Sequence, residues 1–116
     1  MGYYTDYTVE ARGFKKQDEA EFFAFKLVQK GVVNSSTRFH YGQLGLDFSA
    51  QFEVHETKWY DYADDLRTAS LWFPHITIDV EGSGEENGDQ WRHRFRNGEH
   101  ERVEAVISFP EFKVIR

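Results

Sequence analysis

The sequence of 116 residues contains no cysteine, and this absence excludes disulfide bonds, thiolate zinc sites, iron–sulfur clusters and cysteine nucleophiles. It also contains no apolar run near the roughly 20 residues that a membrane-spanning helix needs, and its first residues do not read as a secretory signal. Basic residues are few, since 14 Lys and Arg are outnumbered by 20 Asp and Glu. The net charge of -6 disfavours general binding to nucleic acid or to anionic membranes, so we expect a soluble cytoplasmic protein.

Aromatic residues, by contrast, are abundant, because 11 Phe, 6 Tyr and 3 Trp make up 17% of the chain. A disordered chain rarely carries so much apolar ring surface, so we expect this chain to fold. Its length suits one domain, residues 1–116, and such a domain can bury a core without disulfides or a structural metal.

The negative charge is concentrated in the middle of the chain, where residues 60–89 contain eight acidic side chains and a single basic one. A concentration of this kind produces a local field that attracts cationic partners and speeds their encounter. A solvated surface without a binding role is the alternative interpretation. The candidate partner-binding residues are Asp61, Asp64, Asp65, Glu81, Glu85, Glu86 and Asp89.

Hydrophobic periodicity and turn signals predict the secondary structure. Strands are predicted over 3–14, 37–41, 44–55, 76–81, 90–96 and 99–109. Helices are predicted over 18–30 and 61–73, the second capped by Asp61. In the strand over 44–55, Leu44, Leu46 and Phe48 belong to the face that we expect in the core.

The order of these elements is a βαββαβ unit with an added C-terminal strand. It indicates an α+β, ferredoxin-like sandwich with two helices on one face of a mainly antiparallel sheet. The other face of the sheet is then open to solvent or to a partner.

The dipeptide Asn97-Gly98 predicts a type I′ turn between the last two strands, since both residues accept positive φ angles. This turn pairs Arg96 with Glu99 and Arg94 with Glu101 on one face of the hairpin.

The same register leaves a conflict farther from the turn, because it puts Val103 on the arginine face and Trp91 on the other. A bulge near Arg102 or a strong twist of the hairpin would each resolve it. We expect His93 and His100 to face solvent.

Signals for catalysis are weak. The five histidines lack the spacing of a metal site, and the acidic, glycine-rich loop 81–89 lacks the ligand register of an EF-hand. No serine lies in a nucleophile elbow, and adjacent carboxylates such as Glu85 and Glu86 usually point in different directions. We therefore expect no enzyme activity, no metal and no cofactor. Direct binding of nucleic acid is also not expected, because the aromatic consensus of RNA-binding sheets is absent.

A series of motifs in the second half of the chain indicates a protein family. Residues 56–98 contain Glu56-Thr57-Lys58-Trp59, Leu66-x-x-x-Ser70-x-x-Phe73-Pro74, the segment 84–91 and Asn97-Gly98-Glu99. Together these features resemble the YubB-domain family of ferredoxin-like proteins from phages and plasmids. The resemblance implies a ferredoxin-like fold and a mobile-element accessory protein that acts inside a bacterial host, and it implies little about activity.

A small, acidic protein of this kind suggests a non-enzymatic function, in which the protein binds and blocks a host macromolecule. Host defence complexes such as CRISPR effectors expose basic nucleic-acid channels, which an acidic surface could occupy by imitating phosphate charge. We therefore expect an anti-defence, anti-CRISPR-type inhibitor whose partner is a host protein or nucleoprotein with a basic surface.

Two alternatives stay open. One is a small ligand-binding or enzymatic α+β domain with a pocket between helices and sheet. The other is a homo-oligomer that uses the open sheet face or the edge of the last strand.

Overall fold

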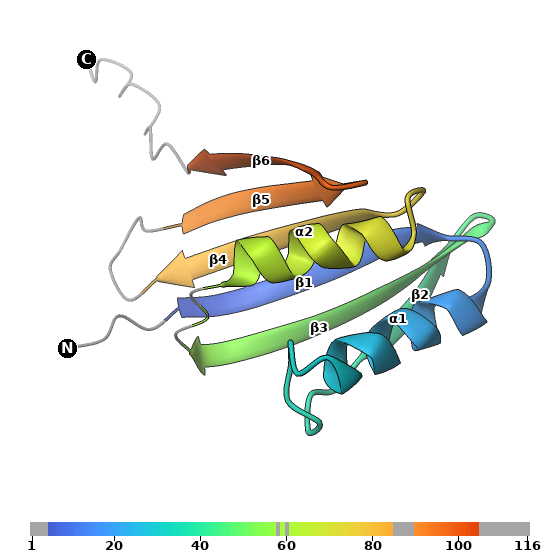
Figure 1. The fold of residues 1–116 in the computed structure, drawn as a ribbon, viewed down its shortest axis with the longest axis horizontal. Coiled ribbons are helices and arrows are strands. Elements are labelled where there is room, and N and C mark those ends of the chain that lie inside the picture. Colours follow the sequence, from blue (N-terminus) through green and yellow to red (C-terminus); the bar gives the residue numbers. More distant parts are fainter. Residues whose placement is uncertain (1–4, 58, 60, 85–89, 105–116) are drawn as a thin grey trace, which may run out of the picture.

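The computed structural model describes residues 5–57, 59, 61–84 and 90–104 and has an α+β fold (Figure 1). The strands are β1 Thr5–Phe14, β2 His40–Leu44, β3 Asp47–Thr57, β4 Thr77–Gly84, β5 Gln90–Arg96 and β6 Glu99–Glu104, and the helices are α1 Gln17–Gln29 and α2 Tyr62–Trp72. The predicted strand positions 3, 4 and 105–109 lie outside the described residues.

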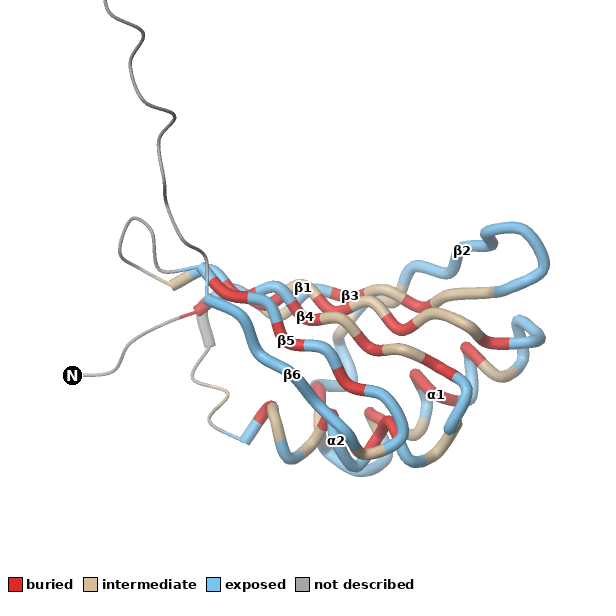
Figure 2. The backbone as a smooth tube through the Cα atoms, turned by 90° about the horizontal axis from the view of Figure 1, so that it is seen from above, coloured by how far each residue is buried: buried red, intermediate tan, exposed pale blue. Residues whose placement is uncertain are grey.

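The six strands form one sheet in the order β2-β3-β1-β4-β5-β6, and every neighbouring pair is antiparallel. Both helices lie on the same face of this sheet, with α1 over β3 and β1 and α2 over β4 and β5 (Figure 1 and Figure 2). The predicted α+β class is therefore confirmed. None of the described helices is long and apolar enough to cross a membrane.

Alternation along the strands decides which side chains enter the core. In β1, Tyr7, Val9 and Ala11 are buried beneath the helices, whereas Glu10 and Arg12 point to the uncovered face. The large, fully buried apolar side chains are Phe14, Phe23, Phe52, Phe95, Leu27, Leu66, Ile76, Ile78, Val9 and Val80. Burial of one such side chain contributes about 1.5–3 kcal/mol of hydrophobic stabilisation, so this layer holds the helices on the sheet.

The turn between β2 and β3 differs from the prediction. Gly45 has a positive φ of 63°, which glycine adopts without strain, and the chain reverses there. The strand predicted over 44–55 therefore begins at Asp47, and Leu44 and Leu46 are 85% and 89% exposed instead of packed in the core. A local backbone turn thus overrides the alternation of apolar residues.

The start of α2 also differs from the prediction. Asp61 occupies the N-cap position, but its side chain makes no capping hydrogen bond, so the predicted cap is wrong. Its φ and ψ angles of -97° and 17° are not the extended conformation from which a side chain reaches the first amides of a helix. Asp65 in the first turn instead accepts a hydrogen bond of 2.9 Å from Trp59 Nε1, which ties the helix to the preceding segment.

The β5–β6 hairpin confirms the predicted turn. Asn97 and Gly98 have positive φ angles of 48° and 81°, as a type I′ turn requires, and the two predicted Arg–Glu pairs lie directly opposite each other. The turn is anchored to α2, because Ser70 Oγ accepts a hydrogen bond of 2.9 Å from the Gly98 amide and Arg67 Nε donates one of 2.8 Å to the Gly98 carbonyl.

The register of the hairpin continues without a shift to the pair Trp91–Glu104, so the structure has no bulge at Arg102. The arginines of β5 point to the uncovered face, while Trp91, His93 and Phe95 point toward the helices. His93 is only 4% exposed, so the prediction that it faces solvent is wrong. His93 lies on the same side of β5 as the rings of Trp91 and Phe95. The hydrophobic effect places this side of the strand in the core.

Close packing between β4 and β5 gives a test of the core. A Cβ atom at Gly82 would lie 2.1 Å from Cε2 of the Trp91 ring. We predict that Gly82→Ala lowers the free energy of unfolding by about 1–3 kcal/mol, because the ring must leave its stacked position on Tyr62. Urea denaturation measures the loss. Ser83→Ala, at the next and exposed position, is the control, and equal stability of the two variants would contradict the packing.

Candidate functional site

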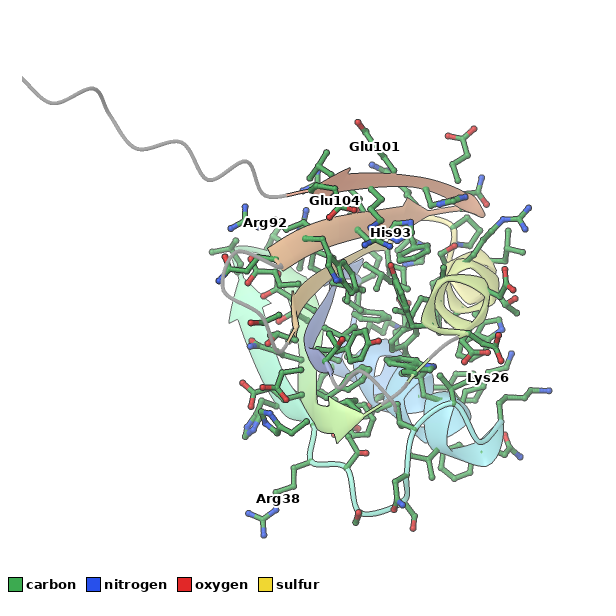
Figure 3. All side chains as sticks on the ribbon, turned by 90° about the vertical axis from the view of Figure 1, so that its left-hand side faces the viewer. Lys26, Arg38, Arg92, His93, Glu101 and Glu104 are labelled. Carbon is green, nitrogen blue, oxygen red and sulfur yellow. The ribbon has the colours of Figure 1, made fainter. Side chains whose placement is uncertain are left out.

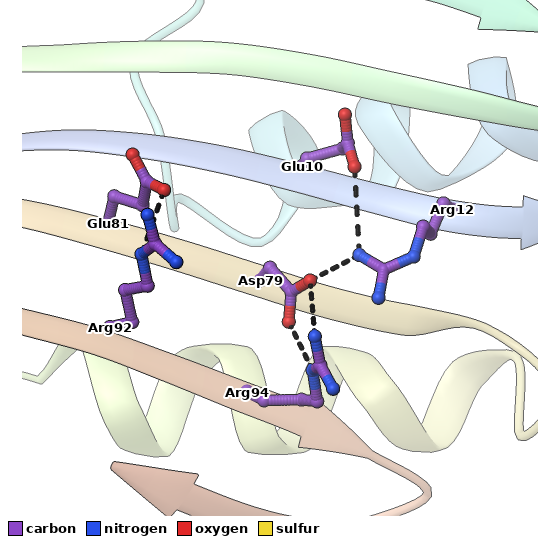
Figure 4. A network of polar contacts seen from close by, with 6 residues as sticks. All are labelled: Glu10, Arg12, Asp79, Glu81, Arg92 and Arg94. Carbon is purple, nitrogen blue, oxygen red and sulfur yellow. Dashed lines mark hydrogen bonds and ion pairs between the residues drawn. The ribbon is translucent and has the colours of Figure 1, made fainter. Parts of the chain in front are cut away.

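The uncovered face of the sheet carries a network of charged side chains from β1, β4 and β5 (Figure 4). Asp79 in β4 is its centre. The carboxylate accepts hydrogen bonds from Arg12 Nη1 and from Arg94, whose Nε and Nη2 lie 2.7 and 3.2 Å from its two oxygens. Arg12 Nη1 also lies 3.6 Å from Glu10 Oε1. One acid thus holds the guanidinium groups of two strands in place.

The charge of Asp79 is maintained by these partners. Burial by itself raises the pKa of Asp79, but the hydrogen bonds from Arg94 and Arg12, together with their positive charges, outweigh burial and hold the pKa below its ordinary value. A second ion pair beside the network joins Glu81 to Arg92 at 3.1 Å and is more exposed. Asp79 and Glu81 are therefore already paired with arginines within the chain.

Two open hollows lie on this face, of about 330 and 450 Å³, and both are lined by Glu81, Arg92 and Val103. Among the described residues whose side chains point to this face, none is Phe, Tyr or Trp. RNA-binding sheets stack bases on such rings. The described part of this face therefore offers bases no stacking platform.

The structure separates the predicted acidic residues. Asp61 and Asp64 are exposed at the start of α2, and no described Lys, Arg or His forms an ion pair with either. Asp65 is half-buried and bonded to Trp59, and Glu81 lies on the opposite side of the sheet. The remaining predicted residues, Glu85, Glu86 and Asp89, lie outside the described residues. Of the described set, only Asp61 and Asp64 form an exposed, unpaired acidic surface.

A chain of polar side chains that the sequence did not reveal links β6, α2 and β5. Arg102 Nη1 donates a hydrogen bond of 3.3 Å to the Tyr62 hydroxyl, and this hydroxyl lies 3.1 Å from His93 Nδ1. On its other side, His93 Nε2 lies 2.8 Å from His100 Nδ1. Figure 3 shows His93 on β5 on the side that faces α2. Its alternation with Trp91 and Phe95 is the sequence signal that could have placed it in the core.

The donor and acceptor roles in this series of hydrogen bonds follow from Arg102, because its side chain can only donate. The Tyr62 oxygen accepts from Arg102, and its hydroxyl hydrogen finds an acceptor among these groups only when His93 Nδ1 carries no proton. His93 then carries its own proton on Nε2 and donates it to His100 Nδ1. Every polar atom in the chain has a partner only while His93 is neutral, which fixes its tautomer.

Burial, together with the nearby positive charges of His100 and Arg102, lowers the pKa of His93 to about 4. Its ring stacks on Phe95 with centroids 4.2 Å apart and meets Tyr62 edge-on. His93 therefore stays neutral at neutral pH and acts as a packed, hydrogen-bonded core residue. Among the described residues, no group of three or more His, Cys, Asp or Glu is placed to hold a metal ion.

No protein-family model matches this chain, and neither a curated protein nor a solved structure matches it. The evidence for its function therefore comes from the residues of this chain.

The Asp79 network gives a prediction about stability. We predict that Asp79→Asn lowers the free energy of unfolding by about 1 kcal/mol at neutral pH, because two arginines lose their shared carboxylate. In the wild type this contribution is present above the ordinary carboxyl pKa and is lost as the pH falls through the lowered pKa of the folded state. Urea denaturation at low and high salt measures the effect, and salt should reduce it. A deficit of the variant that did not shrink as the pH fell below the ordinary carboxyl range would contradict the ionic origin.

The buried histidine gives a prediction with its own pH range. The unfolded chain takes up a proton on His93 below pH 6.5, whereas the folded chain does so only near pH 4, so stability is complete above this range and falls within it. At about pH 5 we expect His93 to account for a loss of about 2 kcal/mol relative to pH 7. Urea denaturation of the wild type and of His93→Gln at both pH values checks this. A loss of equal size in the two proteins would assign it to other groups.

Proposed function

We propose that this chain is a non-enzymatic binding protein that blocks a host macromolecule, and that it meets a basic surface of its partner with acidic side chains at the start of α2. The observation that carries the proposal is that some of the acidic side chains are paired with arginines and others are not. Asp79 and Glu81 are neutralised by arginines of neighbouring strands, whereas Asp61 and Asp64 are exposed and unpaired among the described residues. The electrostatic field of an unpaired, exposed carboxylate is not cancelled by a neighbouring cation. This field attracts a basic partner and speeds its association.

The position of these two acids supports the proposal. β4 ends at Gly84 at the same end of the molecule at which α2 begins (Figure 1). The sequence continues from Gly84 into Glu85, Glu86 and Asp89, which lie outside the described residues. The positive end of the α2 dipole also favours the two acids at the start of α2, so they stabilise the helix as well.

Fold and motifs support a mobile-element origin as part of the same proposal. The order β2-β3-β1-β4, with both helices on one face, is the arrangement expected of a ferredoxin-like βαββαβ unit, to which β5 and β6 add a hairpin. Motif residues of the YubB-type resemblance have structural tasks here, because Ser70 anchors the Asn97-Gly98 turn and Trp59 binds Asp65. We propose on this basis a phage or plasmid accessory protein, with an anti-CRISPR-type inhibitor as the specific form.

The alternative, a ligand-binding or enzymatic domain with a pocket between helices and sheet, has less support. The space under α2 is filled by the rings of Tyr7, Tyr62 and Trp91, whose centroids lie 4.8–5.7 Å apart. The largest hollow that we describe, of about 720 Å³, opens beside β3 and the loop that follows α1.

The proposed surface can be tested with the intact chain as bait in a bacterial lysate. A partner bound by the wild type should bind Asp61→Asn/Asp64→Asn at least about tenfold more weakly, and its affinity should fall from about 50 to 500 mM salt because exposed charges are screened. Asp18→Asn/Glu21→Gln, which removes two acids from the start of α1, changes the net charge equally and should bind as the wild type does. A partner held equally by both double variants, or insensitive to salt, would refute the acidic surface.

A further inference from the structure

The two edges of the sheet differ sharply in charge. β6, at one edge, carries Glu99, Glu101, Arg102 and Glu104 within six residues. Charged side chains of this kind protect an edge strand from pairing with another chain. β2, at the other edge, contains no Asp, Glu, Lys or Arg, and all five of its residues are exposed. The β2 edge therefore lacks the protection that the β6 edge has.

Exposed apolar side chains lie on β2 and on the segments next to it. Leu44 and Leu46 are 85% and 89% exposed, and Tyr41 of β2 is 41% exposed. Phe25, on the helix that lies next to β2, is 61% exposed (Figure 1). Among the described strands only β3 pairs with β2, so the outer side of β2 has main-chain donors and acceptors without a strand partner there. Such a row, flanked by apolar side chains, is suited to the addition of a strand.

We propose that the β2 edge is a self-association site, at which β2 strands of two copies of this chain pair antiparallel about a two-fold axis near Gly42. The pairing would join two six-stranded sheets into one. An antiparallel edge is complementary to itself under such a rotation, because each main-chain donor meets the acceptor of the same segment in the other copy. Gly42 at the midpoint brings no side chain into the closest approach.

Charge selects a second copy at this edge and excludes one at β6. Each copy carries a net charge of -6, so two copies repel unless they meet where formal charge is absent. Residues 39–46 contain no Asp, Glu, Lys or Arg, so β2 pairs with β2 without placing like charges opposite each other. Pairing β6 with β6 would bring three glutamates of each copy together, which is destabilising.

The proposed interface leaves the acidic surface free. α2 packs over β4 and β5, and at least two strands, β3 and β1, separate these strands from β2 in the sheet. The two proposals can therefore fail independently, because a variant at Leu44 changes only association and a variant at Asp61 and Asp64 changes only partner binding.

Light scattering on a size-exclusion column measures the mass of the intact chain over a range of concentrations. We expect the wild type to approach twice the chain mass at high concentration, and we expect Leu44→Glu to raise the dissociation constant at least about tenfold by placing charge at the edge. Val103→Glu is the matched control, since it adds the same charge at an exposed position of the other edge strand and should dimerise as the wild type does. Circular dichroism verifies that both variants fold.

Each other outcome would overturn the proposal. A wild type with the mass of one chain at every concentration would show that the edge does not self-associate. A dimer that Val103→Glu disrupts and Leu44→Glu does not would move the interface to β6. A dimer that survives both variants would place it on another surface.

Discussion

Burial of a single face of the sheet beneath two helices is the constraint on which the rest of the structure depends. Because side chains alternate along a strand, covering one face sends Val9, Ile78 and Phe95 into the core and their neighbours to solvent. Those neighbours must be polar, and on adjacent antiparallel strands they meet as cross-strand pairs. The ion pairs around Asp79 follow directly, since Asp79 lies opposite Arg94 in the register that buries Val80 against the helices.

The same constraint explains why some carboxylates are paired with arginines and others are not. Asp79 and Glu81 on the sheet face are paired with arginines of neighbouring strands, so their field is largely cancelled within the protein. Asp61 and Asp64 at the start of α2 have no ion-pair partner among the described residues and lie at the positive end of the helix dipole. Asp64 and Glu81 are both acidic, but within the part of the chain that the structure describes only Glu81 has an arginine partner. This difference, rather than the net charge, is the physical basis of the proposed binding function.

The hairpin β5–β6 is held to the body of the fold by polar contacts with α2 as well as by the sheet. Ser70 and Arg67 bind both polar groups of the Gly98 peptide, and farther along the hairpin Tyr62 links Arg102 to His93. Buried polar groups stabilise a structure only when each has a partner, and this chain of bonds meets that condition through one tautomer of a neutral histidine. His93 itself is packed between the rings of Phe95 and Tyr62, which favours its neutral form.

The sequence by itself determined the α+β class, both helices, the type I′ turn at Asn97-Gly98 and its opposite-charge pairs, because each depends on residues near one another along the chain. It misplaced Leu44 and Leu46, since alternation does not register the reversal at Gly45, and it misplaced His93, since a histidine carries no fixed preference for core or solvent. It also predicted one surface of seven acidic residues, although Glu81 and Asp64 lie on opposite sides of the sheet. Which strands neighbour each other, which acid finds an arginine and which edge stays uncharged and free were decided by tertiary structure alone, because these depend on contacts between residues far apart in the chain.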